Sequence, residues 1–241
     1  MKLFVIILFS LSSTLFSQEL ADTTYGLIYP NNYSIGIHFN TGGYGIYGEY
    51  ASQVNYKYEH AYGFNISNIH HKNEFKIQGA TGTRSYYYKK INSFLVFRPS
   101  FGGNLKLFNS KREDGIGIVL KWKVGPAFGF LKPVYLDILK QQNIGANPIA
   151  EKYDPEIHEN AVVEGRANWT KGVGEGRFEI GGAAKAGLNF NFAKDESTIS
   201  GGEIGIMVDY FPIRPIELMY GADNFRYFGA FYLQFELGSR F

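Results

Sequence analysis

Residues 115–130, GIGIVLKWKVGPAFGF, decide the fold because large apolar residues alternate along them with small or charged ones. Successive side chains of a β-strand point to opposite faces, whereas a helix repeats every 3.6 residues. One face of this stretch is apolar: Ile116, Ile118, Leu120, Trp122, Val124, Phe128 and Phe130. The other is small or charged: Gly115, Gly117, Val119, Lys121, Lys123, Gly125, Ala127 and Gly129. The stretch therefore predicts a β-strand with two unlike faces.

The same period of two recurs in seven further segments, while no long segment shows the helical period. Pro99 interrupts one of them, since a proline cannot donate to a sheet ladder. The segments lie at about residues 33–40, 43–52, 59–67, 91–101, 180–192, 203–210 and 231–241. The chain is therefore predicted to be all-β, with about eight antiparallel strands.

The small and polar faces indicate which side of the sheet is inside. A lipocalin-like barrel in water would crowd its outer face with Lys, Glu and Thr, because bulk costs nothing there. Here the polar faces carry Gly, Ala, Ser and Asn with one or two charges each, which suits the narrow interior of an eight-stranded barrel. The apolar faces, almost without charge, suit lipid. We predict a single antiparallel up-and-down transmembrane β-barrel.

The N-terminus has the layout of a secretory signal peptide. Lys2 precedes the apolar run LFVIILF, and Ser and Thr follow as far as Ser17. The run is too short for a membrane helix, which needs about 20 apolar residues. We expect a cleavable signal peptide at 1–17, export by the Sec route, and a barrel domain at 18–241. The absence of cysteine excludes disulfides, thiolate metal sites and a lipoprotein anchor.

If the first strand leaves the periplasm, the second, fourth and sixth gaps are periplasmic turns, and the outer gaps are longer except for the short first one, the asymmetry expected of such barrels. The longest gap, 131–176, contains Val134-Tyr135-Leu136, Tyr153 and Trp169, and is too apolar for a purely disordered segment. We expect this outer loop to fold over the barrel mouth or to contact a protein partner.

The chain resembles the small eight-stranded bacterial outer-membrane barrels of the OmpA/OmpX type. The resemblance rests on the signal peptide, the alternating segments and the ending FYLQFELGSRF at 231–241. It implies the outer membrane of a Gram-negative envelope, with its lipid and lipopolysaccharide as surroundings. It further implies that the barrel-assembly machinery reads a C-terminal label formed by Phe231, Leu233, Phe235, Leu237 and Phe241. A segment like 125–136 also occurs in uncharacterised barrels of this length. Neither likeness specifies an activity.

Ten charged residues fall on the predicted inner faces, five acidic and five basic. They are Glu49, Glu59, Arg98, Lys121, Lys123, Lys185, Glu203, Asp209, Glu236 and Arg240. Unpaired charges in a narrow lumen would be costly, so we predict a compensating ion-pair network that closes it. A narrow porin-like pore is the alternative. The net charge of only +2 argues against a nucleic-acid partner.

The sequence gives weaker support to an enzyme active site or a metal site. His38 near Glu49 could serve a lipid A deacylase-like enzyme, but no serine stands in a supporting arrangement. The cluster of Asp154, Glu156, His158 and Glu159 could approach a divalent cation, although its context also suits a turn with solvated charges. We assign no catalytic residue, no metal and no cofactor.

The sequence thus favours a non-enzymatic structural, binding or assembly-accessory role mediated by the outer loops, of which a secretion-machinery subunit is one concrete form. A lipid-modifying enzyme and a narrow pore remain the alternatives.

Overall fold

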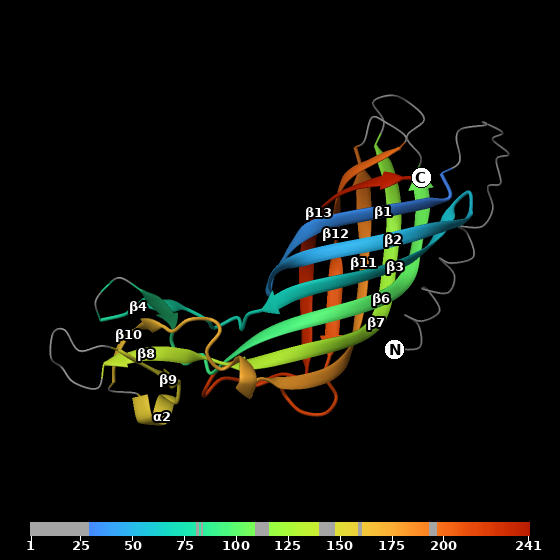
Figure 1. Cartoon of the computed structure of the whole chain (residues 1–241). Helices are drawn as coiled ribbons and strands as arrows, with labels where there is room; N and C mark the ends of the chain where they lie inside the picture. The colour runs from blue at the N-terminus through green and yellow to red at the C-terminus, as the bar shows by residue number, and fades with distance from the viewer. Residues whose placement is uncertain are drawn as a thin grey trace.

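Eight long strands form a closed barrel in the computed structural model (Figure 1). The structure describes residues 29–80, 82, 84–108, 116–139, 148–158, 161–192 and 197–241; the predicted signal peptide lies outside them. The barrel strands are β1 (Asn31–Asn40), β2 (Gly43–Asn55), β3 (Tyr58–Ile69), β6 (Asn92–Phe108), β7 (Gly117–Pro133), β11 (Arg177–Asn191), β12 (Thr198–Tyr210) and β13 (Tyr227–Arg240).

Each barrel strand pairs antiparallel with the barrel strand that follows it in the chain, and β13 returns to β1 to close the cylinder. The closing register pairs Asn32 with Arg240 and Asn40 with Tyr232. Closure leaves no free sheet edge. The predicted all-β, up-and-down barrel of eight strands is confirmed, and with it the OmpA/OmpX-type architecture.

The two alternating faces of each strand form the inner and outer surfaces of the barrel. In β12, Ile204, Ile206 and Val208 are about half exposed on the outer surface, whereas Glu203 and Asp209 are buried inside. The other barrel strands repeat this arrangement, so Ile, Phe, Leu and Tyr side chains cover the outside of the cylinder. Such an apolar surface is unstable in water but matches a hydrocarbon environment.

Pro99 lies within β6, which continues on both sides of it. Its missing N–H faces a gap in the ladder, because the pairing of β6 with β7 passes from Phe97–Phe128 directly to Phe101–Val124. Pro126 of β7 lies in the same gap. The two prolines thus lie together where the pairing of β6 with β7 is interrupted, and β6 nevertheless runs without a break from Asn92 to Phe108.

Short elements extend the barrel at the end opposite the C-terminus, which we call the outer end (Figure 1). They are β4 (Lys76–Gln78), β5 (Ser85–Tyr87), β8 (Tyr135–Leu139), β9 (Ile149–Lys152), α2 (Pro155–His158), β10 (Val162–Arg166) and the 3-10 helix η1 (Val173–Glu175). Strands β10, β8 and β9 form one sheet, and β4 and β5 another. In the described ranges, none of the helices is long and apolar enough to cross a membrane.

The long outer loop begins three residues later than predicted, at Val134 rather than Leu131. Leu131 and Lys132 still pair with Phe94 and Ser93 of β6, so β7 extends to Pro133. Sequence alternation alone could not place this boundary, because Leu131-Lys132-Pro133-Val134 fits a strand end and a loop start equally well.

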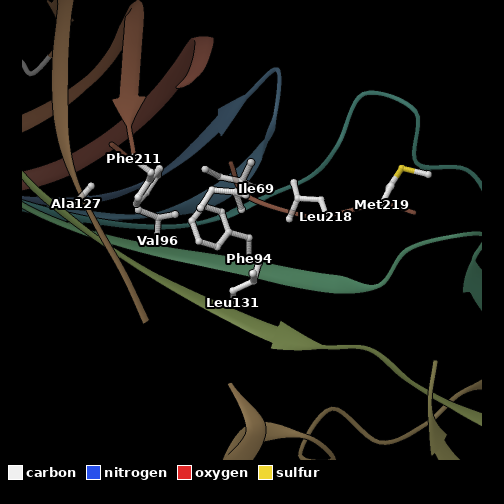
Figure 2. Packing of buried hydrophobic residues seen from close by; sticks show 9 residues of the cluster. Ile69, Phe94, Val96, Ala127, Leu131, Phe211, Leu218 and Met219 are labelled. Atoms are coloured by element: carbon white, nitrogen blue, oxygen red, sulfur yellow. The ribbon is translucent and has the colours of Figure 1, made fainter. Parts of the chain in front are cut away.

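An apolar cluster lies at the outer mouth of the barrel (Figure 2). Strands β3, β6 and β7 contribute Ile69, Phe94, Val96, Ala127 and Leu131, and the segment after β12 contributes Phe211, Ile216, Leu218 and Met219. The Phe94 and Phe211 rings meet edge to face, with centroids 5.2 Å apart. A Cβ on Gly129 would lie 2.4 Å from the Phe94 ring, so only glycine leaves room for this packing.

Candidate functional site

The middle of the lumen is filled by linked carboxylates and ammonium groups. Lys121 lies 2.9 Å from the Glu236 carboxylate and 3.6 Å from that of Glu49. Lys123 also contacts Glu49, and Lys185 lies 3.1 Å from Glu203. Acids and bases therefore alternate across the interior, so that no charge there faces only its own sign.

Neutral side chains complete this network. Tyr47 donates to Glu49 and Tyr232 to Glu203. Gln234, fully buried, donates at 3.2 Å to both Glu203 and Glu236 and accepts from Lys185. Buried charges are tolerated when their remaining hydrogen-bonding capacity is satisfied in this way.

Two further pairs stand nearer the barrel ends. Towards the outer end, Arg98 forms a two-pronged contact of 2.6 and 2.7 Å with Asp209 and donates to Asn65 and Ser67. Towards the end with the C-terminus, Glu59 lies 2.7 Å from Lys106. The planar guanidinium of Arg98 suits bidentate recognition of a carboxylate.

The ten charges predicted for the lumen differ in their burial. Eight are buried: Glu49, Glu59, Arg98, Lys121, Lys123, Glu203, Asp209 and Glu236. Lys185 is half-buried within the network, and Arg240 is half-buried at the end of β13. Sequence reasoning missed Lys106, because the predicted strand stopped at residue 101, and missed the tyrosine and glutamine partners because they carry no charge.

Four residues of the predicted C-terminal label lie on the outer surface of β13, and the fifth, Phe241, directly follows the strand. Phe231, Leu233, Phe235, Leu237 and Phe241 are all exposed. Their side chains are therefore presented to whatever surrounds the barrel.

His38 is buried inside the barrel, where its ring lies 3.1 Å from the Asn65 amide. Glu49, its partner in the enzyme hypothesis, instead contacts Tyr47, Asn104, Lys121 and Lys123. The structure does not bring the predicted pair together.

The acidic cluster of the long loop has ordinary local contacts. His158 accepts from the Asp154 backbone N–H and lies 3.4 Å from Glu151. Glu159 falls outside the described residues. Within the part of the chain that the structure describes, no three His, Asp or Glu side chains converge as metal ligands would.

The described parts of 70–91, 134–176 and 211–226 pack together beyond the barrel rim, and we call them the outer lobe. The Ala80 N–H donates to the Val163 carbonyl at 2.8 Å, and Arg84 lies 2.6 Å from Asp137. The Ile91 N–H donates to the Leu218 carbonyl. The lobe also has an apolar cluster of its own, made by Val134, Leu136, Ile138, Tyr153 and Val163.

A buried ion pair fixes the first segment of the lobe. Glu74 lies 2.6 Å from Lys90 and 2.9 Å from the His70 ring, and accepts from the His71 backbone N–H. Burial alone would raise the pKa of Glu74, but the hydrogen bonds and the Lys90 charge outweigh it and hold that pKa below its usual value. The carboxylate is thereby kept charged.

A cleft of about 840 Å³ lies between the barrel rim and the lobe. Its lining combines basic side chains with the ends of several barrel strands. The basic residues are Lys76, Lys90, Lys132 and Arg166, joined by His38 and His70. Its size is that of a small-molecule or headgroup site. Sequence reasoning missed it, because its residues come from segments far apart in the chain.

Comparison with known proteins gives no family assignment. No protein-family profile matches the chain, and no curated protein matches it significantly. Ail, the attachment invasion locus protein of Yersinia pestis, is a structural match at 13% identity and TM-score 0.42, covering 89% of this chain and 100% of its own. Neisserial surface protein A matches at 7% identity and TM-score 0.40, covering 88% and 96%. The N-terminal barrel domain of Pseudomonas aeruginosa OprF matches at 8% and 0.35, covering 88% and 98%.

Proposed function

We propose that the chain is an integral outer-membrane barrel whose outer lobe binds a protein partner, without catalysing a reaction. The observation that carries the proposal is the lobe itself. Three loops that are separate in sequence form one body with its own apolar cluster. A barrel needs no such body for its own closure.

The surface of the lobe supports a binding role. Ile157 is 74% exposed, and Phe75 and Trp169 are more than half exposed. Large apolar side chains on a water-facing surface are typical of contact sites for other macromolecules. A secretion-machinery subunit would meet this description. We further propose that the exposed apolar residues of β13 are the label for the assembly machinery.

The structure gives less support to the alternative function, a narrow pore. The lumen holds buried ion pairs along its length and an apolar cluster at its outer mouth. Eight-stranded barrels are generally filled by their own side chains. The barrel therefore serves as a membrane-embedded support for the lobe.

Cysteine labelling of intact cells tests the orientation. The chain contains no cysteine, so Ile157→Cys in the lobe and Lys57→Cys in the turn between β2 and β3 are clean single reporters. A membrane-impermeant maleimide should label Ile157→Cys in intact cells and Lys57→Cys only after the outer membrane is permeabilised. The reverse pattern would contradict the proposal.

Site-specific photocross-linking tests the partner. A benzophenone side chain at position 75 or 157 should give a discrete protein adduct in native membranes, and one at Val54, near the opposite end, should not. The middle of the lobe, residues 136–166, is removed by joining Tyr135 to Ala167 through two glycines, since the Ala167 N–H already lies 3.0 Å from the Tyr135 carbonyl. In that variant the adduct at position 75 should disappear. No adduct at either lobe position would overturn the binding role.

A further inference from the structure

The cleft between rim and lobe carries positive charge that the protein does not neutralise. Lys132 is only 3% exposed; its ammonium group donates to the Pro133 carbonyl at 3.0 Å and lies 5.7 Å from the Trp169 ring centroid. Within the described ranges, neither Lys132 nor Arg166 has a carboxylate partner. A buried ammonium group without a counter-ion is costly, and elsewhere in this chain such groups are paired.

The neighbouring charges increase this cost. Arg166 lies close enough to repel both Lys132 and Lys90 electrostatically. Lys90 is balanced by Glu74, at 2.6 Å, but this leaves the other two uncompensated. Lys76 adds an exposed ammonium group over the Tyr87 ring. Charge complementarity therefore calls for an anion at the head of the cleft, held by charge-assisted hydrogen bonds.

The other side of the cleft is apolar and opens onto the outer barrel surface. Phe39, Tyr44 and Ile46 line it from β1 and β2, and each is at least half exposed. The rim is low here because only two residues connect β1 to β2. The same cavity thus joins a basic head region to the surface that would face lipid chains.

We propose that this cleft binds an anionic amphiphile, with a phosphate-type headgroup at Lys132 and Arg166 and its hydrocarbon chain along Phe39, Tyr44 and Ile46. The proposal goes beyond partner binding by the lobe. The residues that would hold the headgroup, Lys132 and Arg166, are not the cross-linked positions 75 and 157, so failure of either proposal leaves the other measurable.

Tryptophan fluorescence of the purified full chain in dodecyl maltoside tests this site. The chain has two tryptophans, so Trp122→Phe leaves Trp169 beside the cleft as the single reporter. The probes are a lysophosphatidic acid, a lysophosphatidylcholine of the same chain length, and inorganic phosphate. Lysophosphatidic acid should change the Trp169 emission saturably, with an apparent Kd at least tenfold below those of the other two.

The variant Lys132→Gln/Arg166→Gln should weaken lysophosphatidic acid binding by at least tenfold, since each lost contact is a charge-assisted hydrogen bond. The control Lys57→Gln removes an exposed lysine in the turn between β2 and β3, at the opposite end of the barrel, and should leave binding unchanged. Arg166→Gln alone, at a solvent-exposed side chain, gives a second variant and should weaken binding at least threefold.

Three results would overturn the proposal. Equal affinity for lysophosphatidylcholine would show a merely apolar surface, and equal affinity for inorganic phosphate would show an anion site without a lipid. Unchanged binding in both cleft variants would show that these cations do not hold the headgroup.

Discussion

The barrel and the outer lobe have opposite interiors. Inside the barrel, Arg98 and Asp209 are buried as an ion pair while Ile204 and its neighbours cover the outside. Inside the lobe, Leu136 and Ile138 are buried, while Asp137 between them points away and pairs with Arg84. Both regions alternate with a period of two, but the apolar face points outward in one and inward in the other.

This difference teaches that the surroundings, not the alternation, set the interior. A strand surrounded by lipid gains nothing by hiding its apolar face, so its interior can be polar if every charge is paired. A strand surrounded by water must bury its apolar face. The change occurs where β7 ends at Pro133 and β8 begins at Tyr135.

The largest expected effect on stability comes from removing one partner of a buried ion pair inside the barrel. Arg98→Leu leaves Asp209 buried and unpaired, and should lower the free energy of unfolding by about 3–5 kcal/mol. The double variant Arg98→Leu/Asp209→Leu should recover most of this loss. Urea unfolding in lipid vesicles, followed by the gel mobility of the folded barrel, measures both. A double variant as unstable as the single one would mean that the pair itself stabilises the barrel.

A slightly smaller effect is expected from opening the apolar interior of the lobe. Leu136 is fully buried, and Leu136→Ala should destabilise the lobe by roughly 2–5 kcal/mol through lost contacts and a cavity. The barrel should keep its gel mobility, because its interior does not include this residue. Limited proteolysis should cut the lobe faster and leave the barrel intact. Loss of the folded barrel would show that the two interiors form one cooperative unit.

Introducing a lysine on the outer surface of the barrel and another on the surface of the lobe compares the surroundings of these two surfaces. Ile204→Lys, near the middle of β12, should cost about 2–4 kcal/mol in lipid vesicles, because the ammonium group enters the hydrocarbon. Ile157→Lys on the lobe should cost less than about 0.5 kcal/mol, because it stays in water. Equal costs in vesicle unfolding would contradict the assignment of the two surfaces.

The smallest effect concerns the ion pair of Glu74. Its pKa is lowered in the folded lobe, so its stabilising contribution is fully present above the usual pKa of a glutamate, about 4.3, and is lost as the pH falls through the folded value. Hydrogen exchange of the 70–91 segment, corrected for intrinsic rates, should therefore show less protection at pH 3 than at pH 7. Glu74→Gln should remove this difference. A difference that persists in the variant would assign it to other groups.

Much of the barrel could be predicted because alternation is a local property. The alternation along residues 115–130 predicts both that this stretch is a strand and which of its residues face inward. The same alternation predicts the other barrel strands. Strand ends are harder to predict: the alternation places Leu131 and Lys132 in the loop, whereas their pairing with β6 keeps them in β7. The cleft could not be predicted, since Lys132 and Arg166 meet only after β8–β10 have folded.

The sequence by itself determined the closed barrel, which residues face its interior, and the near balance of charge there, because each depends on local period and composition. Only the tertiary structure decided which charges pair. Arg98 and Asp209 are 111 residues apart, and their contact depends on strand order and register around the closed cylinder. The tertiary structure also decided that the outer loops enclose an apolar interior beyond the charged interior of the barrel. It likewise brought Lys90, Lys132 and Arg166 together at the barrel rim. Such contacts join distant segments, and a pattern that repeats every two residues carries no information about them.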